Sequence, residues 1–143
     1  MSGVRVYSKE DLLLRSNVPG ATMWAVALEK AMLTYFELKP DTVFPEHSHE
    51  AEQITMVLEG ELTFIYEGKS SVLKAGEVIA VPSNAVHSVT TGRAACKAVD
   101  AWSPVRAEYL QQRENSGEYS KLNYNTNSVR IGHVYKKCAK KQI

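Results

Sequence analysis

The sequence predicts an all-β fold, an antiparallel sandwich or barrel, and three observations support this prediction. Short apolar runs recur along the chain, dipeptides with glycine or proline separate most of them, and several runs have a period of two. Leu62, Phe64 and Tyr66, for example, occupy alternate positions, as in a half-buried strand. Short strands with turn signals between them are typical of antiparallel sandwiches and barrels.

The elements can be assigned in order along the chain. Residues 4–7 look extended, and Ser8 can cap a helical turn at 9–13, with Asp11 well placed in its first turn. Val18-Pro19-Gly20 is a turn. Residues 78–81 form a short buried strand, which Pro82 ends. The expected strands are 22–28, 31–38, 43–49, 53–59, 61–66, 70–74, 77–81, 86–91 and 94–102.

Length and composition indicate one domain. The chain has 143 residues, of which 44% are hydrophobic, and no internal repeat marks a second unit. We expect a domain at 1–109, with the barrel at about 20–103, and a polar basic extension at 110–143. Without a long apolar span or a charged-then-apolar leader, we expect no membrane helix and no secretory signal. Cys96 and Cys138 form no C-x-x-C unit, so reduced thiols in a cytoplasmic protein are expected.

The charges are unevenly distributed. Residues 1–109 hold 10 Lys and Arg against 14 Asp and Glu, whereas residues 110–143 hold 7 against 2. A basic tail can indicate nucleic-acid binding. The acidic body and the lack of a recognisable binding module argue against that function, so we expect neither a nucleic-acid nor a membrane partner. A solvated extension, or one that docks on an acidic surface, is expected instead.

Three histidines and a glutamine are spaced so that their side chains can meet. In an extended strand, His47 and His49 project to the same face, about 6–7 Å apart at the backbone. Residues 50–52 form a bend that lets a second strand bring Gln53 close, and His87 begins a later strand. A single histidine would be read as an ordinary polar residue, but this set predicts a metal site.

These residues carry a resemblance to the cupin superfamily. The segment His47-x-His49-x3-Gln53-x6-Gly60 is similar to the first cupin motif, with glutamine in place of the usual glutamate and Asp41 in place of the leading glycine. The segment Gly76-x5-Pro82-x-Asn84-x2-His87 is similar to the second, with Thr91 in place of the last asparagine. The resemblance covers residues 20–103 and implies a double-stranded β-helix, the jelly-roll cupin barrel.

Gln53 affects the electrostatics of the predicted metal site. Three neutral histidines and a glutamine leave a divalent cation with its full charge, whereas a glutamate would cancel part of it. The ion would then attract anions such as a carboxylate or an enolate, so a small anionic substrate is expected. Four protein donors leave one or two positions open, and they suit zinc, nickel, iron, manganese or cobalt.

A second group of reactive residues lies at the end of the last expected strand. Asp100 and Trp102 share one face of that strand by parity. Ser103 suits the N-cap and Pro104 the first position of a short helix, which places Arg106 in the first turn. The helix dipole disfavours a cation there by about 0.3–1 kcal/mol, so the guanidinium needs another partner. Two interpretations stay open: a substrate site, or a structural role in which Trp102 fills the barrel end and Asp100 pairs with Arg106.

The pattern His-x-His-x3-Gln, a later His and Asp-x-aromatic-x3-Arg resembles a narrower group. These are the small cupins of pectin and alginate breakdown that open 4,5-unsaturated monouronates to linear keto acids. Trp102 stands where that group has a phenylalanine-type aromatic residue. The resemblance implies that Arg106 grips a carboxylate, Trp102 packs on the ring and Asp100 moves a proton between enol oxygen and carbon.

Other functions stay open. A metal-dependent dioxygenase would require a redox-active metal, and a cupin similar to aromatic polyketide cyclases would need a larger, more apolar cavity. A non-catalytic binding cupin would return its ligand unchanged, and the fold alone does not choose among the three. Small cupins commonly pair through sheet edges, so a homodimer is expected, with residues 4–7 added to a neighbour's sheet.

Overall fold

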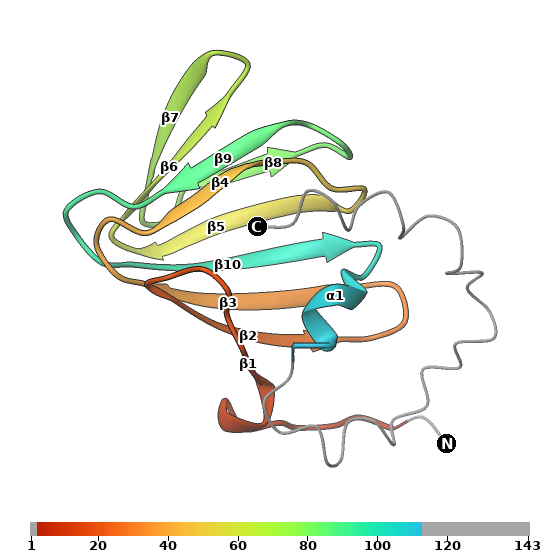
Figure 1. Cartoon of the computed structure of the whole chain (residues 1–143). Coiled ribbons are helices and arrows are strands. Elements are labelled where there is room, and N and C mark those ends of the chain that lie inside the picture. Colours follow the sequence, from red (N-terminus) through yellow and green to blue (C-terminus); the bar gives the residue numbers. More distant parts are fainter. Residues whose placement is uncertain (1–2, 113–143) are drawn as a thin grey trace.

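Two antiparallel sheets face each other across a shared apolar interior (Figure 1). The protein is described here from a computed structural model, which covers residues 3–112. The strands are β1 (Leu13–Leu14), β2 (Ala21–Ala27), β3 (Met32–Leu38), β4 (Val43–His47), β5 (Glu52–Glu59), β6 (Glu61–Tyr66), β7 (Lys69–Lys74), β8 (Val78–Val81), β9 (His87–Thr90) and β10 (Cys96–Ser103). The helices are the 3₁₀ turn η1 (Glu10–Leu12) and α1 (Ala107–Leu110).

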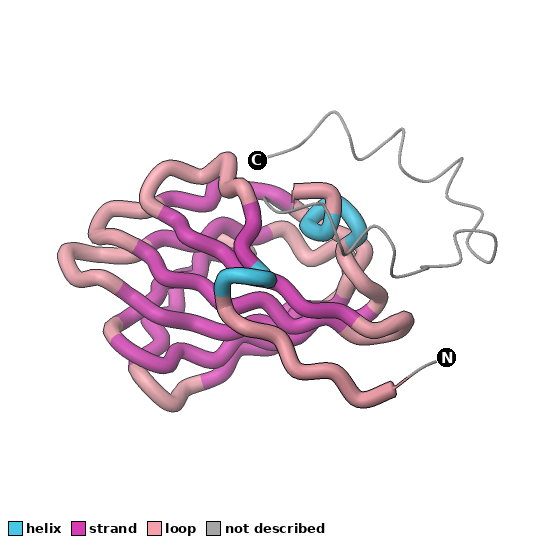
Figure 2. Tube along the Cα trace, turned by 90° about the horizontal axis from the view of Figure 1, so that it is seen from below, coloured by secondary structure: helices cyan, strands magenta, loops and turns pink. Residues whose placement is uncertain are grey.

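The larger sheet has the order β1-β2-β3-β10-β5-β8, and the smaller one β4-β9-β6-β7. The expected all-β class and the jelly-roll architecture are confirmed, and every expected strand from residue 22 onwards lies within two residues of an observed one. Positive φ angles at Gly60, Gly68 and Gly76 confirm three of the turns. Seen from below, the loops gather at the two ends of the strands (Figure 2).

The main apolar core fills the interior between the sheets. Its largest contributors are Phe36 from β3, Val57 from β5, Leu62 and Phe64 from β6 and Cys96 from β10. Cys96 is a free buried thiol, and burial raises its pKa to about 11. Cys138 and the expected extension after residue 112 lie outside the described residues. Among the described residues, α1 is four residues long and η1 three, too short to cross a bilayer.

Three local predictions are wrong. Helix α1 begins at Ala107 and not at Pro104, because β10 continues through Ser103, whose hydroxyl donates to the Lys30 carbonyl and caps nothing. Strand β4 ends at His47, so His49 lies in the loop that follows.

Strand β8 is the third difference. Of its four residues only Val81 is buried, and Val78 is 49% exposed. The reason is its place at the edge of the larger sheet, where one face of the strand points outwards. Residues 4–7 form no strand in the described chain, and Val4 and Val6 are exposed.

Candidate metal centre

The three histidines of the predicted site meet at one end of the barrel. His47 ends β4, His87 begins β9 opposite it, and His49 follows β4 in the loop. One ring nitrogen from each lies within 4.8 Å of the others. His87 and His49 are buried, and His47 is half-buried. The antiparallel pairing of β4 with β9 therefore brings together residues 40 positions apart in the sequence.

Each imidazole is oriented by a backbone carbonyl. The Nδ1 atoms lie 2.7 Å from the carbonyl of Pro45 for His47, 2.7 Å from that of Ala51 for His49, and 2.9 Å from that of Ala85 for His87. Because a carbonyl oxygen only accepts, each Nδ1 carries the proton and each Nε2 keeps its lone pair. Such outer hydrogen bonds fix the rings of metal-binding histidines in the required tautomer.

Gln53 supplies a fourth acceptor at the same point. Its Oε1 lies 3.0 Å from His49 Nε2. Its Nε2 donates to Thr55 Oγ1 at 2.9 Å and to Asp100 Oδ2 at 3.4 Å, which fixes the orientation of the amide. Two lone-pair atoms thus face each other without a proton between them. A cation placed among them would satisfy both, so this donor set fits a metal ion.

The electrostatic environment keeps the histidines ready to bind. Burial is the main cause that lowers the pKa of His47 and His49 to about 4, and it also lowers that of His87. The rings are therefore neutral at pH 7, as metal ligands must be. His87 Nε2 is buried and has no hydrogen-bond partner among the described residues, which is costly unless a ligand occupies the site.

Asp100 lies beside this cluster on β10. Burial raises its pKa to about 7, against a hydrogen bond from Thr55 and the charge of Arg106, which lower it. Its Oδ2 accepts from Gln53, whereas no described residue bonds to Oδ1. A carboxyl group with this pKa exists in both protonation states near neutral pH, which suits a group that accepts and returns a proton.

Arg106 has the additional partners that its position required. Its Nε donates to Glu108 at 2.7 Å and its Nη1 to the hydroxyl of Tyr109 at 2.9 Å. The guanidinium carbon lies 4.9 Å from the ring centroid of Trp102 and 4.4 Å from that of Tyr109. Within the described residues the ion pair of Arg106 is with Glu108 and not with Asp100, so the direct Asp100–Arg106 link does not form.

Trp102 combines both of the roles that the sequence left open. Its Nε1 donates to Thr34 Oγ1 at 2.8 Å, and its ring packs in a small cluster with Ala27, Met32 and Ala51. The same ring meets His49 edge-on at 5.2 Å and lines the cavity. It therefore fills the barrel end and forms one wall of the site.

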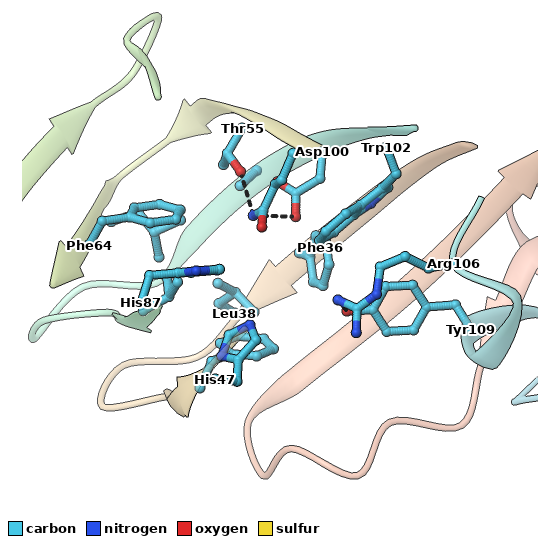
Figure 3. A pocket seen from close by; sticks show the side chains of 15 residues that line it. Phe36, Leu38, His47, Thr55, Phe64, His87, Asp100, Trp102, Arg106 and Tyr109 are labelled. Atoms are coloured by element: carbon cyan, nitrogen blue, oxygen red, sulfur yellow. Dashed lines mark hydrogen bonds between the residues drawn. The ribbon is translucent and has the colours of Figure 1, made fainter. Parts of the chain in front are cut away.

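A cavity that is open to solvent at its mouth connects these groups (Figure 3). Its polar wall contains His47, Gln53, Thr55, His87, Asp100 and Arg106, with Trp102 and Tyr109 beside them. The remaining lining is apolar: Phe36, Leu38, Phe44, Leu62, Phe64, Val89 and Ala98. The cavity can hold a cation at the histidines and an anionic group beside it. Its apolar lining can contact the part of a ligand that lies between them.

Sequence reasoning missed three members of this site. Thr55 shares the inward parity of Gln53, but it lies in the mostly apolar run 54–58, which gives no polar signal. Tyr109 looks in sequence like an apolar ring, although its hydroxyl accepts from Arg106. Glu108 lies two residues from Arg106, a spacing that gives no helical signal.

A jelly-roll barrel with three histidines and a glutamine at one end defines a class of small β-barrel proteins with a candidate metal site. The family model described as a cupin domain matches residues 34–102, and the fold of the chain is that of the cupin superfamily. The matched range includes the three histidines, Gln53, Asp100 and Trp102.

Individual relatives share parts of the chain. The pectin degradation protein KdgF of Dickeya dadantii is 31% identical over 65 residues, which are 45% of this chain and 59% of that protein. The structure of KdgF from a Halomonas species superposes with a TM-score of 0.62 at 24% identity, over 66% of this chain and 90% of that one. The polyketide cyclase RemF of Streptomyces resistomycificus gives a TM-score of 0.61 at 25% identity, over 71% and 80% of the two chains.

Proposed function

We propose that the protein is a metal-dependent cupin enzyme that opens and ketonises a 4,5-unsaturated uronate, a small anionic sugar acid. The observation that carries this proposal is the convergence of four lone-pair atoms beside a buried carboxyl group and a guanidinium in one cavity. The 31% identity to a pectin degradation protein over 65 residues supports the choice of substrate. The proposed location is the cytoplasm.

The metal ligands would be His47, His49, Gln53 and His87, and the ion a divalent zinc, nickel, iron, manganese or cobalt. When bound, it supplies positive charge that stabilises an enolate-like oxygen of the substrate. All four protein donors are neutral, so none of this charge is cancelled within the ligand set.

The protein's own side chains would position the substrate. Arg106 retains terminal N–H groups beyond those used by Tyr109, and these can bind a carboxylate in bidentate fashion. The rings of Trp102 and Tyr109 lie next to each other, and both contact the guanidinium and limit its movement. Trp102, at the wall of the cavity, would pack on the sugar ring.

Asp100 would act as the general acid–base. Its unpartnered Oδ1 is the atom free to take the proton from the enol oxygen and return it to carbon. The bond from Gln53 to Oδ2 holds the carboxyl group in place during both transfers.

The direct test compares wild-type protein with Asp100→Ala after metal analysis, using 4,5-unsaturated galacturonate and following loss of the double bond. We expect turnover to fall by at least about 100-fold in Asp100→Ala, a typical contribution of general acid–base catalysis, while metal content stays unchanged. Lys97→Gln, on the outer face of the same strand, is the matched control. Full activity in Asp100→Ala would contradict the role of Asp100.

A second candidate is chemistry on a more apolar substrate, as in a polyketide cyclase. The apolar part of the cavity favours it, as does the similarity to RemF. If metal-loaded wild-type protein leaves unsaturated galacturonate unchanged but converts an aromatic polyketide, this candidate replaces the uronate. A requirement for iron and oxygen would instead indicate a dioxygenase, and a ligand recovered unchanged would indicate a binding protein. We also propose that the protein is a homodimer.

A further inference from the structure

The amide of Gln53 could meet the metal centre with either of its two ends. Its oxygen accepts hydrogen bonds and its nitrogen only donates them, but the two ends have nearly the same shape. In the structure the oxygen is the end that faces the histidines, because Oε1 lies 3.0 Å from His49 Nε2. If the amide turned over, its N–H would donate to that ring nitrogen and cap the lone pair that a metal needs.

Without an ion, His49 alone would favour the turned amide. Because its ring carries the proton on Nδ1, the lone pairs of His49 Nε2 and Gln53 Oε1 face each other across 3.0 Å. A hydrogen bond from the amide nitrogen would satisfy the ring, and buried polar atoms without a partner are costly. The observed orientation must therefore be held from the other end of the side chain.

Thr55 is the main partner at that other end. Gln53 Nε2 donates to Thr55 Oγ1 at 2.9 Å and to Asp100 Oδ2 at 3.4 Å, and these bonds are the two dashed lines beside Thr55 and Asp100 in Figure 3. Hydrogen bonds from an N–H group to an oxygen usually span about 2.7–3.2 Å. The bond to Thr55 is therefore the better formed of the two.

The hydroxyl of Thr55 offers Gln53 lone pairs and no proton. A hydroxyl has a single proton to donate, and that of Thr55 forms a hydrogen bond to the carboxyl group of Asp100. A turned amide would place its oxygen against the lone pairs of Thr55 and Asp100 with no proton between them. The hydrogen bonds of Thr55 therefore favour the orientation in which Gln53 can bind a metal.

The strand pairing supplies a matched pair of threonines. Thr55 on β5 and Thr34 on β3 are the two cross-strand neighbours of Asp100 on β10, and their exposed fractions are 1% and 0%. Thr55 lies two residues after Gln53 on the same face of β5. The hydroxyl of Thr34 instead accepts from Trp102 Nε1. The position relative to Gln53, and not the burial, distinguishes the two threonines.

We propose that Thr55 is a positioning residue, which keeps the oxygen of Gln53 directed at the metal centre and prevents the amide from closing the empty site. The inference rests on the ligand set proposed above. Thr55 acts through Gln53, so its role should be visible in metal binding before any substrate is added.

Titration calorimetry with zinc on the metal-free, full-length protein tests this role. Thr55→Val keeps the shape of the side chain but removes the acceptor, so we expect zinc affinity to fall about 10–100-fold. Thr55→Ser keeps the hydroxyl and should bind zinc like the wild-type protein. Thr34→Val removes an equally buried hydroxyl and is the matched control, with no loss of affinity expected. Affinity is the quantity to measure, because protein loaded with excess metal stays occupied after a change of this size.

A second comparison separates the orientation of the amide from general damage to the site. In Gln53→Glu the carboxylate has two equivalent oxygens, so no orientation has to be held. Adding Thr55→Val to Gln53→Glu should therefore change zinc affinity much less than Thr55→Val does alone. A merely structural effect would instead lower the affinity by the same factor in both backgrounds. Thr55→Ala takes the place of Thr55→Val if that variant does not fold.

The inference is supported by a loss of affinity in Thr55→Val that is absent in Thr55→Ser, in Thr34→Val and in the Gln53→Glu background. If wild-type protein binds zinc and Thr55→Val binds it equally well, the inference is wrong, although the ligand set stands. Equal losses in Thr55→Val and Thr34→Val, or equal factors in the two backgrounds, overturn it as well. If wild-type protein binds no zinc, the ligand set itself is wrong, and the inference fails with it.

Discussion

The inner and outer faces of strands β5 and β10 carry opposite chemistry. Inside, Gln53, Thr55 and Asp100 are buried polar residues, whereas outside, Ile54 and Met56 are exposed apolar residues. The usual distribution in a surface sheet is the reverse. The inversion is confined to one end of the strands, because the inward residues farther along, such as Val57 on β5, belong to the apolar core.

The comparison distinguishes side chains that stabilise the fold from side chains that belong to the proposed site. Buried polar groups cost free energy unless they are hydrogen-bonded, and the inner face meets this cost with a connected network. Gln53 donates to Thr55 and Asp100, and Trp102 donates to Thr34. Only His87 Nε2 and Asp100 Oδ1 are left without partners in the described chain, and both belong to the proposed site.

The largest predicted change is a loss of metal affinity when one proposed ligand on the inner face is removed. His87→Ala deletes a buried imidazole whose Nε2 is directed at the metal centre, so we expect metal affinity to fall by at least about 100-fold. Titration calorimetry with zinc on metal-free protein measures it, and the mass in light scattering should not change. Ser88→Ala, the next residue on β9, is the control, since its side chain points to the other face. Wild-type affinity in His87→Ala would remove this residue from the ligand set.

Replacing the neutral amide of Gln53 by a carboxylate tests whether the charge of the inner face matters. In Gln53→Glu, the second carboxylate oxygen would occupy the place of the amide nitrogen, 3.4 Å from Asp100 Oδ2. Two carboxylates at that distance cannot both ionise freely, so one pKa rises and Asp100 stays protonated. We expect metal to remain bound and turnover of the unsaturated uronate to fall by about tenfold or more. Glu52→Gln, exposed on the same strand, changes the charge by one without affecting turnover. Unchanged turnover in Gln53→Glu would show that the neutral donor is not required.

The sequence predicted the strands, and the meeting of the three histidines with Gln53, for a physical reason. Both depend on local patterns: alternation along a strand, turn residues between strands, and parity that places His47, Gln53 and His87 on inward faces. The spacing within the two cupin motifs then indicated that these residues lie at the same end of the barrel.

What the sequence could not give depends on contacts between distant segments. In the run Ile54 to Leu58 the even residues are the more apolar set, yet the odd residues Thr55 and Val57 face the core, and the pairing of β5 with β10 and β8 decides this. The start of α1 was also missed, because the pairing of Ser103 with Glu52 extends β10 past the apparent cap. The network around Arg106 depends on how α1 packs against Trp102, which no spacing rule encodes.

The smallest predicted change is a rise in KM when the hydroxyl of Tyr109, the outermost contact of the proposed site, is removed. Tyr109→Phe keeps the ring against Arg106 and Trp102 but removes the acceptor for Arg106 Nη1. A hydrogen bond to a charged group contributes about 1.5–3 kcal/mol, so we expect KM for the anionic substrate to rise by roughly tenfold or somewhat more. The value of kcat should hardly change, because the hydroxyl holds the guanidinium and touches no reacting atom. Tyr35→Phe is the matched control: it removes a hydroxyl that bonds to Glu37 on the outer face, so KM should not change. If both substitutions raise KM equally, the two faces of the sheet are coupled, and the separation of a polar inner site from an apolar outer face is wrong.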